Sequence, residues 1–186
     1  MNKISIYLAT SLMIVCTIVG IGIGYLLTPQ YTLTMYDKTT MDLGRADKWL
    51  DLRYIDAMIA HHRGAILIAK QAEVSTRPEV KNLALEIQRS EPLLITELYA
   101  WKKAWYNDTR SVKDPIVPNL GSYDTSFDLR FLNALIAHHA AGVVMTRDVR
   151  AKSTRSEILN NADAVEQFLT TSGTMLKEWR MSWYKI

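Results

Sequence analysis

Apolar residues recur every three or four positions along four stretches of the chain, which is the spacing that an α-helix gathers onto one face. In the first stretch, charged residues such as Arg53 and Asp56 fall away from this face. In the second and fourth stretches, the apolar positions alternate by four and three residues in a heptad pattern. The pattern predicts four α-helices, at residues 46–74, 77–106, 126–152 and 155–184.

Proline and glycine residues divide these helices. Pro78 suits the first turn of the second helix, where its missing N–H is not needed. Residues 107–125 contain two prolines and a glycine and predict a long connection between two helical hairpins. Pro92 and Gly173 fall at corresponding places inside the second and fourth helices, and we expect each to kink or weaken its helix.

The two hairpins are copies of each other. Residues 51–62, DLRYIDAMIAHH, align with residues 128–139, DLRFLNALIAHH, and eight of the paired residues are identical. The second helix of each hairpin also matches, with the offset increased by one residue. We therefore predict an all-α protein, a four-helix bundle of two repeated hairpins related by a pseudo-twofold axis.

The amino-terminal segment carries no charged residue from Ile4 to Leu27 and is long enough to span a bilayer. It is longer than the apolar region of a typical signal peptide and lacks a small-residue cleavage site. Lys3 precedes it, which favours a cytoplasmic amino terminus and an extracytoplasmic bundle. The predicted organisation is an uncleaved transmembrane anchor, a linker and the bundle, at residues 1–28, 29–45 and 46–186.

Charge and cysteine content narrow the function further. The formal net charge is +3, but the Lys and Arg residues are scattered among acidic ones, which argues against nucleic acid as a partner. Cys16 lies inside the predicted anchor, and no cysteine follows it. The bundle therefore uses neither disulfides nor thiolate ligands, and any soft metal ligand in it must be methionine.

The chain has four histidines, and they form two repeat-equivalent pairs, His61–His62 and His138–His139. On a helical wheel, His62 lies near the centre of the apolar stripe and His61 about 100° away on its edge. The repeat gives His139 and His138 the same two directions, so four imidazoles are expected to approach the bundle centre. Hydrogen-bonded core histidines remain an alternative, although leucine would fill such space without burying an imidazole.

Two methionines accompany the histidines. Met58 lies one turn from His61 and His62, and Met145 lies two turns beyond His138. Imidazole and thioether without thiolate favour copper, as Cu(I) rather than Cu(II), whereas zinc gains little from methionine. A carboxylate-bridged di-iron site is disfavoured because the chain contains no Glu-x-x-His sequence.

Three acidic residues could also serve the site. Glu91 occupies a heptad position that is otherwise apolar, and its repeat counterpart is Leu169. It is either an additional ligand or an acceptor that orients a histidine N–H, unless it faces water before Pro92. We expect Asp51 and Asp128 to be helix-start residues, and the alternative is that they are outer polar partners of the histidines.

The paired histidines carry a resemblance to a known family. Residues 51–70 and 128–147 resemble the two halves of the DUF305 family, whose motif has the form M-x-x-H-H-x-x-x-x-x-M. The resemblance covers residues 36–186. It implies an exported bacterial metal-binding protein with a ferritin-like four-helix fold, and copper binding or copper tolerance as its role. Together with the predicted anchor, we expect the bundle on the extracytoplasmic side of a bacterial inner or plasma membrane.

This chain departs from the family motif in a complementary way. The first half keeps Met58 but has Ile68 in the second methionine position, whereas the second half has Leu135 in the first position and keeps Met145. Glu91 stands where the family often has glutamine. The first half is expected to contribute more binding energy, because Met145 lies about 10 Å along the helix from its histidine.

We therefore interpret the chain as a membrane-anchored, extracytoplasmic metal-binding protein that sequesters or passes on copper. Its predicted ligands are the four histidines with Met58 and Met145, and Glu91 is a possible addition. The metal ion and the membrane are the expected partners, and the sequence names no protein partner. The alternatives are a ferritin-like metal-dependent oxidoreductase acting at the same site and a structural or interaction bundle with core histidines.

Overall fold

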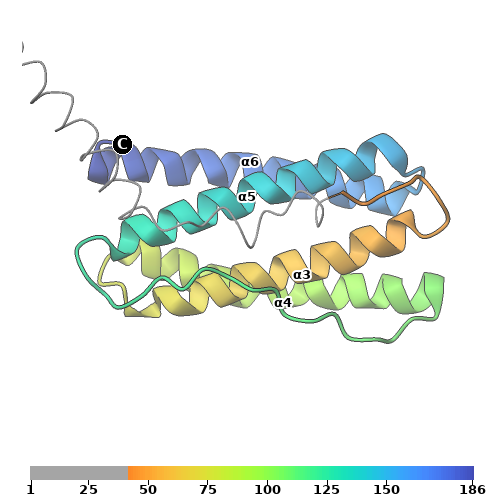
Figure 1. The fold of residues 1–186 in the computed structure, drawn as a ribbon, viewed down its shortest axis with the longest axis horizontal. Helices are drawn as coiled ribbons and strands as arrows, with labels where there is room; N and C mark the ends of the chain where they lie inside the picture. Colours follow the sequence, from red (N-terminus) through yellow and green to blue (C-terminus); the bar gives the residue numbers. More distant parts are fainter. Residues whose placement is uncertain (1–41) are drawn as a thin grey trace, which may run out of the picture. The chain divides into compact units, whose positions relative to one another are not determined.

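The computed structural model of the protein describes residues 42–186. These residues form four α-helices and a single 3-10 turn, without a strand: α3 (Leu50–Gln71), η1 (Ala72–Val74), α4 (Pro78–Tyr106), α5 (Phe127–Lys152) and α6 (Ser156–Tyr184) (Figure 1). The prediction of an all-α, four-helix protein is confirmed. The predicted anchor at residues 1–28 lies outside the described residues. No helix within residues 42–186 combines the length and the apolar character that crossing a membrane requires.

The helices pair as the repeat predicts. Helix α3 packs against α4 and α5 packs against α6, and the two hairpins meet through α3 and α5. Figure 1 shows α3 and α5 crossing the middle of the molecule in opposite directions. Helices α4 and α6 do not form a comparable interface. The bundle is therefore closed along α3–α5 and open between the outer helices.

Neither Pro92 nor Gly173 interrupts its helix. Helix α4 continues through Pro92, and α6 continues through Gly173. The proline lacks an N–H, so one backbone hydrogen bond of α4 is missing at this point. The long packed interface with α3 outweighs the loss of one backbone hydrogen bond, so each hairpin keeps two full-length helices.

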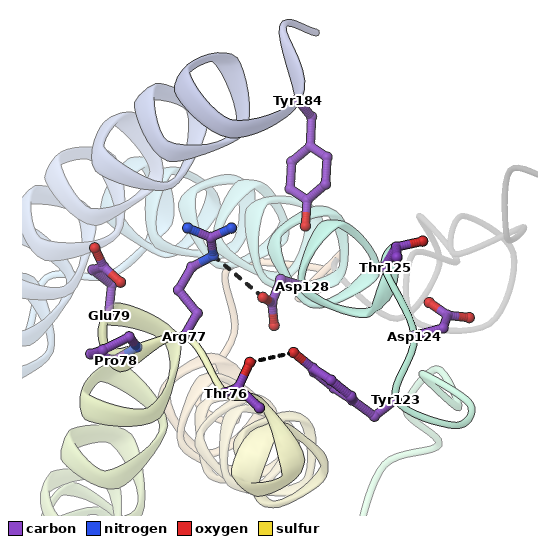
Figure 2. Close-up of a pocket in the computed structure, with 9 residues that line it drawn as sticks. All are labelled: Thr76, Arg77, Pro78, Glu79, Tyr123, Asp124, Thr125, Asp128 and Tyr184. Carbon is purple, nitrogen blue, oxygen red and sulfur yellow. Dashed lines mark hydrogen bonds and ion pairs between the residues drawn. The ribbon is translucent and has the colours of Figure 1, made fainter.

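At each end of the bundle, an aspartate that accepts hydrogen bonds from a serine and an arginine joins the two hairpins. We call each of these clusters a polar lock. At one end, Asp128 in the first turn of α5 accepts hydrogen bonds from Ser75 Oγ at 2.7 Å and Arg77 Nε at 3.4 Å. The Arg77 guanidinium lies 4.0 Å from the Trp183 ring centroid. Figure 2 shows Arg77 reaching Asp128 at the end of the bundle near Tyr184. This lock fastens the α3–α4 turn to the ends of α5 and α6.

The opposite end repeats this lock. Asp51 accepts from Ser153 Oγ at 2.7 Å and from Arg155 Nε at 3.1 Å. The Arg155 guanidinium lies 4.2 Å from the Trp105 ring centroid. Asp51 therefore lies in the first turn of its helix, as expected, and so does its counterpart in α5. Both aspartates also connect the two hairpins, at positions far from the histidines.

The repeat begins earlier than the alignment from residue 51 indicated. Arg53 Nε donates to the Leu43 carbonyl oxygen at 2.5 Å, and Arg130 Nε donates to the Leu120 carbonyl oxygen at 2.6 Å. A glycine with φ of 73° follows each of these leucines, a left-handed conformation that favours glycine. The segment that leads into each hairpin is thus fixed in the same way.

Candidate metal centre

The structure places the four histidine rings together at the middle of α3 and α5. The rings of His61 and His138 stack, with centroids 3.9 Å apart and planes 6° from parallel. His62 lies 6.0 Å from His61, and His139 lies 6.2 Å from His138, both edge to face. The predicted pseudo-twofold arrangement thus brings the two pairs into one cluster, with the inner rings in contact.

Two glycines make room for the stacked rings. A Cβ atom at Gly142 would lie 2.8 Å from Cε1 and Nε2 of His61 and 2.4 Å from Cδ1 of Leu169. A Cβ atom at Gly64 would lie 3.2 Å from Cε1 of His138. The role of these glycines was not predicted from the sequence, although each follows its histidine pair closely and lies inside a helix, where glycine is unfavourable without a packing reason.

All four imidazoles line a cavity of about 870 Å³ between α4 and α6, which we call the α4–α6 groove. Most of its exposed lining is apolar. Its walls include Ile87 and Leu94 from α4 and Val165, Phe168 and Leu169 from α6. Buried apolar side chains form two clusters in the bundle, and the histidines belong to neither of them. The histidines instead line a groove that opens to solvent.

Glu91 orients His62. The Nδ1–H of His62 donates a hydrogen bond to Oε2 of Glu91, whose side chain is buried rather than turned towards water. The other ring nitrogen of His62, Nε2, is buried and has no hydrogen-bond partner. A carboxylate on one imidazole nitrogen fixes the tautomer and leaves a lone pair on the other, which is the usual preparation of a metal-binding histidine.

His139 is the repeat counterpart of His62, but both of its nitrogens are already used. Its Nδ1–H donates to the Leu135 carbonyl oxygen at 2.8 Å, and Ser172 Oγ donates to its Nε2 at 3.1 Å. Leu169 stands where the first hairpin has Glu91. The two halves of the cluster are therefore chemically different.

The inner pair has nitrogens to spare. His138 is 3% exposed, and its Nε2 has no hydrogen-bond partner. The ring of His61 stacks on that of His138, and neither nitrogen of the His61 ring makes a hydrogen bond within the described residues 42–186. His61, His62 and His138 each have a ring nitrogen without a hydrogen-bond partner, whereas both ring nitrogens of His139 have one.

Burial keeps the imidazoles of His61, His138 and His139 uncharged. It lowers the pKa of His61 well below the ordinary value, and the neighbouring imidazoles lower it further. Burial, followed by the same repulsion, lowers the pKa of His138 to about 3. The pKa of His139 falls to about 4, again through burial, although the Leu135 carbonyl and Glu91 oppose the shift. Metals bind the neutral imidazole, so these rings are in the required form at neutral pH.

Met58 and Met145 lie together, away from the groove wall. Both are buried in one apolar cluster with Tyr54, Ile55 and Val149. Their repeat counterparts, leucine and isoleucine, lie in the other apolar cluster. The two methionines that the halves retain are thus on the same side of the histidines. Their predicted role as ligands stays a prediction.

The rings do not converge on one point in this structure. Within residues 42–186, no three side chains of His, Cys, Asp or Glu are arranged to hold a metal ion. The stacked planes of His61 and His138 explain this, because parallel rings direct their nitrogens side by side. Binding one ion through both rings requires rotation about their side-chain bonds.

Comparison with known proteins agrees with the duplicated histidine motif. Residues 51–122 match the model of a protein family described as "Domain of unknown function (DUF305)". The predicted resemblance to DUF305 is confirmed. No curated protein matches the chain.

The fold is also that of solved structures of CopM. CopM in the Cu(I)-bound form is 28% identical, with 74% of this chain and 99% of that chain covered and a TM-score of 0.65. CopM in the Cu(II)-bound form is 27% identical, with 72% and 97% covered and a TM-score of 0.61. CopM in the apo form is 28% identical, with 72% and 98% covered and a TM-score of 0.64. The four-helix bundle is therefore similar to a protein that has been solved with copper in both oxidation states.

Proposed function

We propose that the chain binds copper through its histidine cluster, on the extracytoplasmic side of a bacterial membrane to which residues 1–28 anchor it, and sequesters the metal or passes it on. One observation carries the proposal: His62 and His138 each bury an Nε2 atom beside the α4–α6 groove without a hydrogen-bond partner. A buried polar atom without a partner costs about 1–3 kcal/mol. A bound metal removes that cost.

The donors fit copper. Imidazole nitrogen suits Cu(I), Cu(II) and Zn²⁺, and His61 and His138 offer it in neutral form. His61, His62 and His138 would hold the ion, because these rings have free nitrogens. Glu91 would position His62 through the Nδ1 hydrogen bond. His139 would bind only after giving up Ser172 or the Leu135 carbonyl.

The preference for Cu(I) over Cu(II) rests on the two methionines. Thioether is a soft ligand that stabilises Cu(I). Met58 is one turn from His61 and His62, and Met145 lies in the same apolar cluster as Met58. If either side chain turns towards the histidines on binding, the centre gains a soft ligand without any thiolate. Zinc would gain little from that change.

Anaerobic titration tests copper binding. The full-length chain, kept in mild detergent, is titrated with Cu(I) against a chromogenic chelator and compared with a variant in which His61, His62, His138 and His139 are all alanine. We expect the native chain to take Cu(I) from the chelator and the variant to fail. Equal binding by both proteins would overturn the proposal and favour a structural bundle with core histidines.

A further inference from the structure

The α4–α6 groove is the open side of the histidine cluster. On another side of α3, the connection between the hairpins covers the helix: Arg63 forms an ion pair with Asp114, at 3.0 Å between Nε and Oδ1. Pro115 Cγ would lie 3.4 Å from a Cβ at Gly64, next to His138. The inner faces of α3 and α5 meet each other. The α4–α6 groove is therefore the side from which an ion can approach the buried, unpartnered nitrogens.

The formally charged residues that line the groove are all acidic. Its lining includes Glu86, Glu97 and Glu157 near the exposed surface and Glu91 at depth, and it includes neither lysine nor arginine. This contrasts with the whole chain, whose formal net charge is +3. The acidic lining is thus a local feature of the groove and does not reflect the average composition of the protein.

The apolar walls strengthen the effect of these carboxylates. Phe168 is 55% exposed at the groove and lies 6.3 Å from His139, ring centroid to centroid. Walls of low polarity displace water, which screens charges, so the field of a few carboxylates extends further than it would on an open surface. At the inner end of the groove, the Nε2 atoms of His62 and His138 have no hydrogen-bond partner. These are the atoms that would bind the cation.

We propose that the α4–α6 groove is the route by which a metal cation reaches the histidine cluster, and that Glu86, Glu97 and Glu157 steer the cation into it. This inference rests on the proposed metal-binding function and adds to it the path and the residues that set the rate of loading. The three glutamates act on the approach of the ion and do not ligate it at the cluster. Their removal therefore changes association and leaves dissociation almost unchanged.

The test uses Ag(I) as the probe, in nitrate buffer because chloride precipitates silver. The variant E86Q/E97Q/E157Q is compared with E73Q/E79Q/E178Q, which loses the same number of exposed carboxylates away from the groove. Stopped-flow quenching of tryptophan fluorescence gives the association rate, since Trp101 lines the groove. A silver electrode gives the dissociation constant, and circular dichroism confirms folding.

We expect the groove variant to bind Ag(I) about tenfold more slowly than the native chain at low ionic strength. The difference should vanish near 1 M sodium nitrate, where the screening length is about 3 Å. The control variant should bind at the native rate. Equal slowing in both variants, or native association in the groove variant, would overturn the steering role of the three glutamates.

A second pair of variants tests the path independently of charge. Ala164→Phe places a bulky ring in the groove lining, and Ala104→Phe places one on an exposed position of α4 outside it. We expect Ala164→Phe to slow association and dissociation together by about tenfold and to leave the dissociation constant unchanged. Native rates in this variant would exclude the groove as the route. If the native chain binds no Ag(I) or Cu(I), the proposed function fails, and the route fails with it.

Discussion

At the scale of single residues, two histidines that the repeat makes equivalent are not equivalent in chemistry. His62 donates to Glu91 and keeps a free nitrogen, whereas His139 uses both nitrogens on Leu135 and Ser172. The sequence predicted where all four imidazoles would gather and singled out Glu91, because heptads and repeats report position. It could not predict which ring nitrogens have partners, because the side chains of Glu91 and Ser172 lie 29 and 33 residues from their histidines, on other helices.

This difference predicts unequal effects of two substitutions that remove a hydrogen bond to a histidine. Glu91→Gln keeps the shape of the side chain but removes the carboxylate that fixes the tautomer and orientation of His62, so Cu(I) affinity should fall about 10–100-fold. Ser172→Ala frees His139, which is not among the proposed ligands, and should change affinity less than about threefold. Chelator competition measures both. A larger loss for Ser172→Ala would reverse our assignment of the ligands.

The methionines provide a second comparison. Met58→Leu should weaken Cu(I) binding more than Met145→Leu, because Met58 is one turn from two histidines, whereas Met145 is about 10 Å along its helix from His138. Both substitutions nearly conserve volume and should cost less than about 1.5 kcal/mol of folding stability. Cu(II) affinity should change less than Cu(I) affinity in both variants. If Met145→Leu is equally damaging or worse, the thioethers act jointly from their shared cluster.

At the scale of helices, the sequence pattern predicted the structure better than it predicted individual side-chain contacts. The structure has helices close to all four predicted ranges, because long amphipathic segments with turn residues between them leave few alternatives. Pro92 and Gly173 were expected to kink or weaken their helices, yet neither interrupts them. The α4–α6 groove could not be predicted, because it depends on the way two hairpins meet, which the pattern along any one helix does not encode.

The two glycines inside α5 and α6 allow a matched test of helix packing. Gly142→Ala places a Cβ 2.4 Å from Leu169 and 2.8 Å from His61, so the stack must shift, and unfolding free energy should fall by about 1–3 kcal/mol. At Gly173 the nearest atom would be 3.9 Å away, and alanine should stabilise the helix by up to about 1 kcal/mol. Urea denaturation of the metal-free proteins measures both. Stabilisation by Gly142→Ala would show that the rings have room to spare.

At the scale of the whole molecule, the duplicated sequence becomes a duplicated scaffold around an asymmetric site. The locks at Asp51 and Asp128 are nearly identical, with Ser Oγ–Asp distances of 2.7 Å in both. The divergence is concentrated at the middle, in Glu91 against Leu169 and in the placement of the methionines. The aspartates are predicted at helix starts, but their partners across the two hairpins cannot be predicted from the sequence pattern, since those partners meet only after the hairpins dock.

The buried, neutral histidines also make the stability of the whole bundle depend on pH. Unfolded histidine has a pKa near 6.5, whereas the pKa of folded His138 is about 3 and that of His139 about 4. Below pH 6.5 the unfolded chain binds more protons than the folded one. The contribution of these groups is therefore fully present above pH 6.5 and is lost as the pH falls, by about 1.4 kcal/mol per pH unit for each histidine.

The measurement is the unfolding free energy of the metal-free protein, with a chelator present, at intervals from pH 7.5 to 5. Over this range the native chain should lose stability steeply, and His138→Gln should flatten the slope by about 1.4 kcal/mol per pH unit at the acidic end. Carboxylates titrate mostly below this window, so they affect the two proteins alike. An unchanged slope in His138→Gln would mean that the ring accepts a proton in the folded state. The cluster would then be open to water and ions even without metal, and the buried, unpartnered nitrogen on which the proposed function rests would not exist in solution.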